Sequence, residues 1–388
     1  MTRDCPVCYN SDQKVVFSVD YPLDDLYILG NKQIIYACEI CGMVFSDASR
    51  NQSDYDNYYL NLPDYTPNIE DNDTANQNRI AQTLNQVKAY ITETTNICDL
   101  GCGSGYLLEN LYKQGFKRLT GIDARLDFKQ DKYKYERKLI SSFDASCLSK
   151  YDFTFCIGIL EHIYDLKSLI ERISSNISET KYFYIEVPNA SRYHEKVISP
   201  YQDFNLEHIN HFSEQAIKNL AIKNDLEIIF CTTIYQAESN NYQMPVISCL
   251  LKKKPLQEAL KISKDETLLQ NINQYIAKST KLLDRMNEYI DSITSKDERI
   301  YIWGVGQLCL KLCQLKVFKR LRIEACIDKS FQSKELKEYR ILAPCFELNP
   351  EIPILIGSTL HAESIQNDIV NLGIKNRVII IPPEAVLD

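Results

Sequence analysis

The segment that most constrains the fold is a glycine-rich turn between an apolar run and a helix start. It reads Asn96-Ile-Cys-Asp-Leu-Gly-Cys-Gly-Ser-Gly-Tyr-Leu-Leu108, with glycines at Gly101, Gly103 and Gly105. Glycine tolerates positive φ and lets a ligand approach the backbone closely, as in dinucleotide-binding folds. Strand-like and helix-like segments alternate from here to about residue 252. The pattern predicts an α/β fold with a mostly parallel sheet that is covered on both faces.

Two acidic residues end the strand-like runs on either side of this turn. Asp99 ends the run before the first glycine, and Asp123 ends the next run, Leu119-Thr-Gly-Ile-Asp123. A carboxylate at the second strand end is placed to accept hydrogen bonds from ribose hydroxyls. Because ligands of such sheets bind at the carboxyl ends of the strands, we expect a nucleoside-containing cofactor there.

A third segment, Tyr151-Asp-Phe-Thr-Phe-Cys-Ile-Gly-Ile-Leu-Glu-His162, makes the pattern more specific. Together, the three segments resemble those of the class I S-adenosylmethionine-dependent methyltransferases, in which this one is the fourth strand and the following loop. The resemblance implies that the three glycines line the methionine and adenosine of the cofactor and that Asp123 holds the ribose. It also implies the remaining cofactor-side residues: Asp99, Asp144 at the adenine edge, and Ile159, Leu160, Glu161 and His162 beside the bound cofactor.

Two other interpretations of the turn are less well matched. In an NAD-type Rossmann site the third glycine of the turn comes three residues after the second, whereas Gly105 comes two residues after Gly103. A degenerate fold without cofactor, or a non-enzymatic scaffold, is disfavoured because Asp99, the glycines and Asp123 are all intact.

Four N-terminal cysteines form two pairs with metal-binding spacing. They are Cys5-Pro-Val-Cys8 and Cys38-Glu-Ile-Cys41, the second followed by glycine. Two such cysteine pairs can make a closed tetrahedral zinc site. A site of this kind has a structural role, because no coordination position is open to a substrate. A zinc ribbon of this size folds only with its metal. Redox-active thiols, or a chance spacing, are the alternatives.

Two of the five histidines lie in the segment Asp203-Phe-Asn-Leu-Glu-His-Ile-Asn-His-Phe-Ser213. A histidine beside a glutamate can act as a general base near neutral pH. The order of cysteine pairs, methyltransferase pattern, this segment and a C-terminal α/β region resembles that of the sugar C-methyltransferases of deoxysugar biosynthesis. In that family a Tyr-x-Glu-His motif helps to remove a proton next to a ketone, which implies this role for Glu207 and His208. The chain departs from the motif at Asn205, where the family has tyrosine, and at His211, where an aromatic residue is usual.

The resemblance implies that the acceptor is a nucleotide-linked ketosugar, methylated at carbon in glycan or natural-product biosynthesis. The alternative is methylation of an oxygen or nitrogen of another small molecule or glycan precursor. His208 is a general base in the first case; positioning of the substrate, or a merely structural hydrogen bond, are its other possible roles. The expected bound groups are S-adenosyl-L-methionine and a structural Zn²⁺.

We predict four parts: a zinc-binding module at 1–60, a methyltransferase domain at 61–255, a connecting amphipathic helix at 256–297 and a smaller Rossmann-like α/β domain at 298–388. The helix is predicted from apolar residues that recur at three- and four-residue steps between Leu269 and Ile293. The last part repeats a glycine turn, Gly304-x-Gly306, and a strand ending in Asp328. It lacks a third glycine, so we do not expect a second nucleotide site. The family resemblance implies that this domain closes over the cofactor cleft and supplies part of the acceptor pocket.

Composition excludes several classes of protein. The net charge of -8 argues against nucleic acid as a partner, because phosphate neutralisation needs a basic surface. No apolar run resembles a signal peptide or is long enough to span a bilayer, so we expect a cytoplasmic protein without membrane contact. In a reducing cytosol the 14 cysteines do not form a disulfide framework. We expect a monomer or homodimer.

Overall fold

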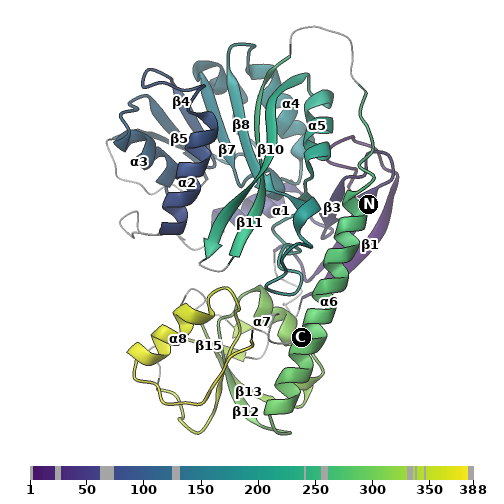
Figure 1. Ribbon diagram of the computed structural model, residues 1–388, viewed down its shortest axis with the longest axis vertical. Helices are drawn as coiled ribbons and strands as arrows, with labels where there is room; N and C mark the ends of the chain where they lie inside the picture. Colours follow the sequence, from purple (N-terminus) through teal and green to yellow (C-terminus); the bar gives the residue numbers. More distant parts are fainter. Residues whose placement is uncertain are drawn as a thin grey trace. The chain divides into compact units, whose positions relative to one another are not determined.

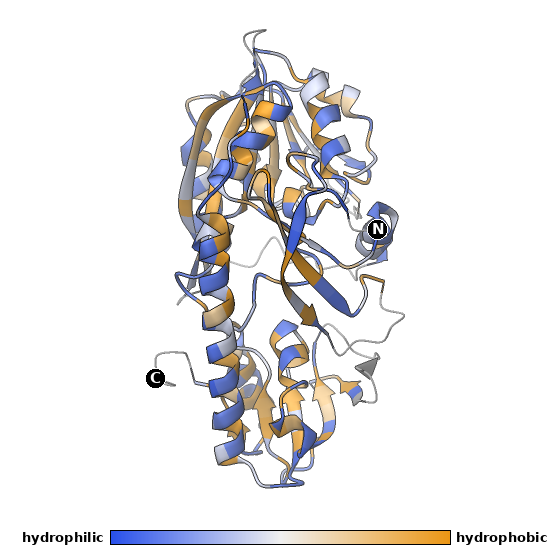
Figure 2. Ribbon diagram, turned by 90° about the vertical axis from the view of Figure 1, so that its right-hand side faces the viewer, coloured by the Kyte–Doolittle hydropathy of each residue, from blue (hydrophilic) through white to orange (hydrophobic). Residues whose placement is uncertain are grey.

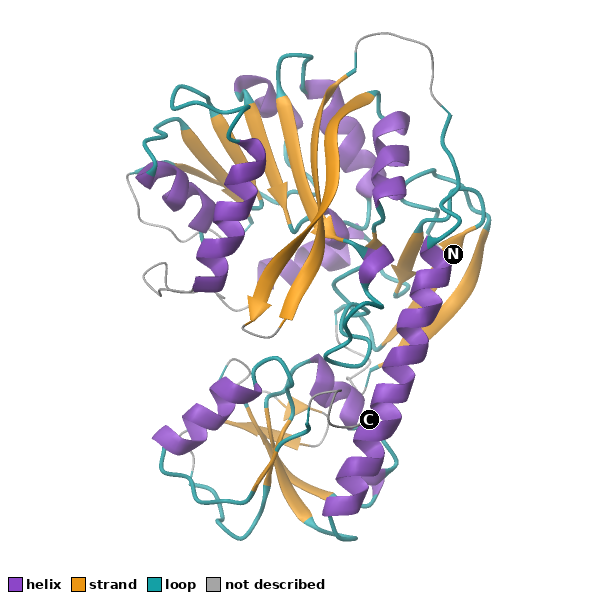
Figure 3. Cartoon of the chain, viewed as in Figure 1, coloured by secondary structure: helices purple, strands orange, loops and turns teal. Residues whose placement is uncertain are grey.

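A computed structural model describes residues 3–21, 28–61, 74–124, 132–239, 242–254, 261–329, 335–336, 339–344 and 347–382 (Figures 1 and 3). The chain divides into two compact units. The first comprises Met1–Phe17, Ile34–Arg192 and Glu207–Asn271, and the second comprises Ser18–Gln33, Tyr193–Leu206 and Ile272–Asp388. The N-terminal cysteine pairs and the methyltransferase pattern therefore belong to one unit. The domain boundaries inferred from the sequence remain predictions.

The first unit is built on a seven-stranded sheet in the order β10-β11-β8-β7-β4-β5-β6. Five strands are parallel: β4 (Ile97–Leu100), β5 (Leu119–Asp123), β6 (Lys134–Arg137), β7 (Phe153–Ile157) and β8 (Tyr182–Pro188). The last two, β10 (Leu226–Ser239) and β11 (Tyr242–Lys253), run antiparallel to their neighbours. This is the mostly parallel α/β sheet expected from the sequence.

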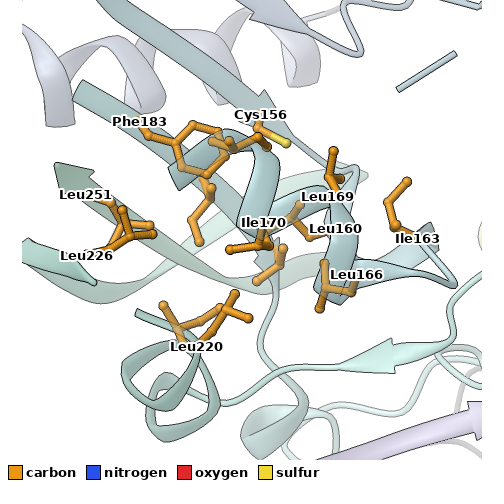
Figure 4. Close-up of a cluster of buried hydrophobic side chains, with 14 of the residues drawn as sticks. Cys156, Leu160, Ile163, Leu166, Leu169, Ile170, Phe183, Leu220, Leu226 and Leu251 are labelled. Carbon is orange, nitrogen blue, oxygen red and sulfur yellow. The ribbon is translucent and has the colours of Figure 1, made fainter. Parts of the chain in front are cut away.

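Helices cover both faces of this sheet because side chains alternate between the faces along each strand. In β7, Cys156 packs into a cluster with α4 (Leu166–Asn176) and α5 (Glu214–Lys223). Its neighbour Phe155 packs into a second cluster with α2 (Thr74–Val87) and α3 (Tyr106–Lys113). Figure 4 shows the first cluster, in which Leu166, Leu169 and Ile170 of α4 lie at the three- and four-residue spacing of one helix face.

A second sheet of the chain has the order β1-β2-β3-β9 and contains the N-terminal residues. Its strands are β1 (Gln13–Asp20), β2 (Lys32–Cys38), β3 (Val44–Asp47) and β9 (Asn210–His211). β9 comes from the Glu-His segment of the methyltransferase part and pairs antiparallel with β3. The N-terminal module is therefore completed by a strand that lies more than 150 residues away in the chain. Helix α1 (Gln52–Asn61) follows it.

The third sheet has the order β14-β15-β13-β12-β16-β17. Its strands are β12 (Arg299–Trp303), β13 (Arg322–Ile327), β14 (Glu335–Leu336), β15 (Tyr339–Leu342), β16 (Ile354–Ile356) and β17 (Val378–Ile379). All pairings except β14 with β15 are parallel, and the helices α7 (Gln307–Leu312) and α8 (Ala362–Asn371) lie between strands in sequence. Figure 2 shows these strands as largely hydrophobic.

The expected connecting helix is α6 (Leu268–Ile293), a single helix of 26 residues. Its fully buried face is formed by Leu268, Ile272, Tyr275, Leu282, Met286 and Ile290. Three apolar residues that recur at helical spacing in this segment, Leu269, Ile276 and Leu283, are only half-buried, so part of the predicted stripe is shifted by one residue to Leu268, Tyr275 and Leu282. Within the part of the chain that is described, no helix combines the length and apolarity that crossing a membrane requires.

Candidate functional site

The glycine turn follows β4 and has the backbone conformation that only glycine adopts readily. Gly101 has a φ of 83°, and a Cβ added there would lie 2.1 Å from the Cδ1 atom of Ile159. Gly103 has a φ of 48°, and an added Cβ would meet nothing within 4 Å, so the space beside this residue is open. Gly105, at a φ of 74°, caps the start of α3. The turn thus packs closely against the loop after β7 and leaves backbone exposed in the middle.

Asp123 ends β5 where the sequence predicts it. Its Oδ2 atom accepts a hydrogen bond from the Gly103 backbone N–H at 2.9 Å. The predicted ribose-binding carboxylate and the open glycine of the turn are therefore in direct contact.

Asp99 and Glu161 are two buried carboxyl groups at the carboxyl ends of neighbouring strands, each with an exposed fraction of 4%. Burial raises the pKa of Asp99 to about 7, and the nearby Asp123 adds to the rise. Burial likewise raises the pKa of Glu161 to about 8. Its Oε2 atom has no hydrogen-bond partner among the described residues. A buried carboxylate in this condition favours a cationic ligand.

Arg79 on α2 was not foreseen from the sequence. Its charge acts on both Asp99 and Glu161 and lowers their pKa values against the larger effect of burial. Helix α2 is held to the sheet by Thr83, whose hydroxyl donates to Glu186 Oε1 at 2.7 Å. An arginine in a polar, glycine-poor helix carries no motif, so no sequence signal distinguished it.

Asp144 has a different environment from the other predicted cofactor residues. Its side chain is exposed and caps the short 3₁₀ turn Ala145–Lys150, accepting from the Ser146 N–H at 2.9 Å and from the Ser146 hydroxyl at 2.7 Å. These two bonds lower the pKa of Asp144. Its role at the adenine edge remains a prediction.

Beside Glu161, a cluster of histidine and tyrosine side chains surrounds the predicted proton-transfer residues. The rings of His162 and His208 meet edge to face, with centroids 4.8 Å apart. The Nδ1 atom of His162 lies 2.9 Å from the Tyr59 hydroxyl and 3.2 Å from the Glu207 carbonyl oxygen. Tyr58 donates its hydroxyl hydrogen to Glu207 Oε1 at 2.8 Å. Five residues from three separate segments thus meet at one place.

Both histidines in this cluster are neutral at physiological pH. Burial lowers the pKa of His162 to about 3, with His208 adding to the effect, and lowers the pKa of His208 to about 4. A neutral imidazole can accept a proton, although burial makes the charged product costly. Glu161, His162 and His208 each offer one ligand atom within 4.8 Å of the others, so this set could also bind a metal ion.

The tyrosines of this cluster come from helix α1 and not from the Glu-His segment. Asn205 replaces the local tyrosine, but Tyr58 and Tyr59 on α1 contact Glu207 and His162. The signal was the tyrosine-rich run at residues 54–59, whose function the sequence could not assign. His211 is fully buried in β9, and its Nε2 atom is 2.9 Å from the Ser46 hydroxyl.

The four N-terminal cysteines also converge. All are buried, and their sulfur atoms lie within 4.8 Å of one another, with Cys5 and Cys41 at 3.6 Å and Cys8 and Cys38 at 3.5 Å. Gly42, after the second pair, has a φ of 76° and leaves no room for a Cβ against the Asp265 backbone. The arrangement is compatible with a tetrahedral zinc site.

Residues 73–229 match a family model described as a methyltransferase domain. This segment is therefore similar to a methyltransferase domain. It contains the glycine turn, Asp123 and the Glu161–His208 cluster, so the match supports the predicted enzyme class and disfavours the NAD-type interpretation. The N-terminal cysteine pairs and the third sheet lie outside the matched residues.

Two curated relatives match parts of the chain. The ubiquinone biosynthesis O-methyltransferase of Hydrogenovibrio crunogenus is 38% identical over 88 residues, which cover 20% of this chain and 36% of the relative. The tRNA U34 carboxymethyltransferase of Nautilia profundicola is 22% identical over 176 residues, which cover 43% of this chain and 48% of the relative. The chain thus spans between about a third and a half of the length of these relatives.

Among solved structures, the 1,6-didemethyltoxoflavin-N1-methyltransferase of Burkholderia thailandensis has a TM-score of 0.38 and 13% identity, over 53% of this chain and 87% of that one.

Proposed function

We propose that this protein transfers the methyl group of S-adenosylmethionine to a nucleotide-linked ketosugar, at the carbon next to the carbonyl. The observation that supports it is that the predicted cofactor-binding residues and the His162–His208 pair are joined by one short backbone segment. Glu161 and His162 are adjacent in one 3₁₀ turn after β7, so the cofactor side of the site and the His162–His208 pair share a backbone segment. A methyl donor and an acceptor must meet at such a place.

The chain's residues fit the cofactor. The open space beside Gly103 and the carboxylate of Asp123 suit the ribose and adenosine, because a side chain at residue 103 would fill the approach. Glu161 offers a buried carboxylate oxygen that has no hydrogen-bond partner in the described part of the chain, which suits a ligand that carries positive charge. When bound, S-adenosylmethionine supplies an electrophilic methyl group on a sulfonium.

The Glu207–His208 segment prepares the acceptor in this proposal. His208, neutral at working pH, accepts the proton from the carbon beside the ketone. Tyr58 orients the Glu207 carboxylate, and Tyr59 together with the Glu207 carbonyl orients His162.

One observation favours a second candidate. A relative with 38% identity over part of the chain is named an O-methyltransferase. If this chain methylates a hydroxyl or an amine, the same cluster orients that nucleophile and His208 need not remove a proton from carbon. We also propose that the four-cysteine site binds one structural zinc ion, because four buried sulfurs so close together would otherwise pack without a shared ligand.

Product analysis distinguishes the two acceptors. The purified protein is incubated with methyl-labelled S-adenosylmethionine and a panel of nucleotide sugars with and without a keto group. A mass gain of one methyl, located on carbon by fragmentation of a ketosugar, supports the proposal. Methylation confined to hydroxyl or amino groups supports the second candidate, and no methylated product with any acceptor class contradicts both.

A further inference from the structure

Arg3 is a buried arginine two residues before the first zinc-ligand cysteine, Cys5, with an exposed fraction of 8%. Its guanidinium lies between two aromatic rings, 5.2 Å from the centroid of Phe45 and 5.1 Å from that of Tyr164. Its backbone N–H donates to Asp47 Oδ2 at 3.0 Å. Burying a cationic side chain is costly unless hydrogen bonds compensate for the lost water, and in Arg3 the two Nη atoms make these bonds.

The partners of the guanidinium come from the two loops that hold the histidines. Nη1 donates to the Tyr164 carbonyl at 3.2 Å, and Nη2 donates to the Ile209 carbonyl at 2.5 Å and to Asn210 Oδ1 at 2.9 Å. Tyr164 lies two residues after His162, and Ile209 directly follows His208. One side chain of the N-terminal module therefore joins the backbone on both sides of the cluster.

The same two loops are joined to each other by a second set of bonds. The side-chain amide of Asn210 donates to the carbonyls of Leu160, at 2.7 Å, and Ile163, at 2.8 Å. The Ile209 N–H donates to the Glu161 carbonyl at 2.8 Å. Because Arg3 holds Asn210 Oδ1, it orients the amide that makes these bonds. These bonds hold the two loops in one arrangement relative to each other, although the Nε atom of Arg3 has no hydrogen-bond partner among the described residues.

We propose that Arg3 is a positioning residue: it couples the fold of the four-cysteine module to the placement of His162 and His208. This inference rests on the proposed methyl transfer. It gives the zinc module a part in turnover, since unfolding of the module withdraws Arg3 from the two loops. A misplacement of about 1 Å in reacting groups can lower a rate about 10²-fold.

The test compares Arg3→Met, Arg3→Lys and a control, Arg118→Met. Arg118 is an exposed arginine in the same unit with a single carbonyl partner, Thr94 O at 3.4 Å. We expect Arg3→Met to lower kcat about 10²-fold. The Kd for S-adenosylhomocysteine and the zinc content should stay within about twofold of wild type, because the hydrogen bonds of Arg3 go to Asp47, Tyr164, Ile209 and Asn210 and not to the glycine turn or a cysteine sulfur. Arg3→Lys keeps the charge without the planar fork and should lose less. Arg118→Met should match wild type.

A second readout needs no acceptor. The chain has five histidines, so the imidazole signals of a histidine-labelled sample are few enough to assign by substitution. In Arg3→Lys, which retains the cation, we expect the signals of His162 and His208 to shift while that of His361 does not. Wild-type kcat and unshifted histidine signals in Arg3→Met or Arg3→Lys would overturn the proposal. So would a parallel loss of zinc, cofactor affinity and turnover, which indicates general destabilisation. If wild type methylates nothing, the proposed function fails, and the histidine signals alone decide for Arg3.

Discussion

Cofactor binding should depend on pH through Glu161, and the change can be worked out from its environment. Burial raises the pKa of this carboxyl to about 8, and one of its oxygens has no hydrogen-bond partner within the residues that the structure describes. If the cationic cofactor binds only when Glu161 is ionised, the apparent Kd is multiplied by one plus ten to the power of the pKa minus the pH. That factor falls from about 100 at pH 6.0 to about 4 at pH 7.5, so affinity should rise roughly 25-fold.

Glu161→Gln is the perturbation that isolates this effect. It keeps the shape of the side chain and removes the charge, so the variant should bind S-adenosylmethionine weakly and with little change between pH 6.0 and 7.5. Isothermal titration at several pH values measures both. The two histidines of the cluster do not interfere, because their pKa values of about 3 and 4 leave them neutral throughout this range.

Asp99→Asn is the matched control. The pKa of Asp99 is about 7, so its own ionisation should change the cofactor affinity less than that of Glu161 over this pH range. The rise of affinity with pH that is due to Glu161 should persist in Asp99→Asn. The ligand-free protein gives an independent check of sign. When folding raises the pKa of a carboxyl group, the folded protein becomes less stable as the pH increases from the carboxyl's unfolded pKa, here near 4.5, towards its folded pKa of about 8. Glu161→Gln removes this effect and should therefore raise the Tm at pH 8. An affinity that is equal at both pH values in wild type would refute the reasoning.

Three further changes test the rest of the site. Asp123→Ala should weaken cofactor binding by about 1–3 kcal/mol, because ribose hydroxyls would lose a charged acceptor, and an unchanged Kd would remove Asp123 from the site. The purified protein should contain close to one zinc per chain, and Cys5→Ser should give protease-sensitive protein; elemental analysis that finds no zinc would contradict this. His208→Ala should lower turnover about 10²–10⁴-fold with little effect on cofactor affinity. Wild type with S-adenosylhomocysteine should also exchange deuterium at the carbon beside the ketone, and His208→Ala should not. Absence of exchange with every ketosugar tested would favour an oxygen or nitrogen acceptor.

The cofactor half of the site was largely predictable from local sequence. Its chemistry lies at the ends of short apolar runs, and the positions of Gly101, Gly103 and Asp123 follow from the strand-turn-helix pattern because neighbouring strands place their carboxyl ends at one edge. The acceptor half was predictable only in part. Glu207 and His208 were predicted from a motif, and their role stays a prediction; Tyr58 and Tyr59, which bond to Glu207 and His162, lie more than 100 residues earlier, in a helix without a periodic signal.

Sequence alone determined the parts of this protein whose physics is local: the glycine turn, the acids at strand ends, the two cysteine pairs and the long amphipathic helix. Tertiary structure decided which distant groups meet. Arg79 reaches two buried carboxyls from α2, Arg3 binds the loops on both sides of the histidines, and β9 completes the sheet of the N-terminal module. The pKa values of Glu161 and His208 also depend on this packing, because they are set by removal from water. Backbone periodicity encodes which face of an element is apolar, but it carries no information about which polar side chain the opposite element will bring to that face.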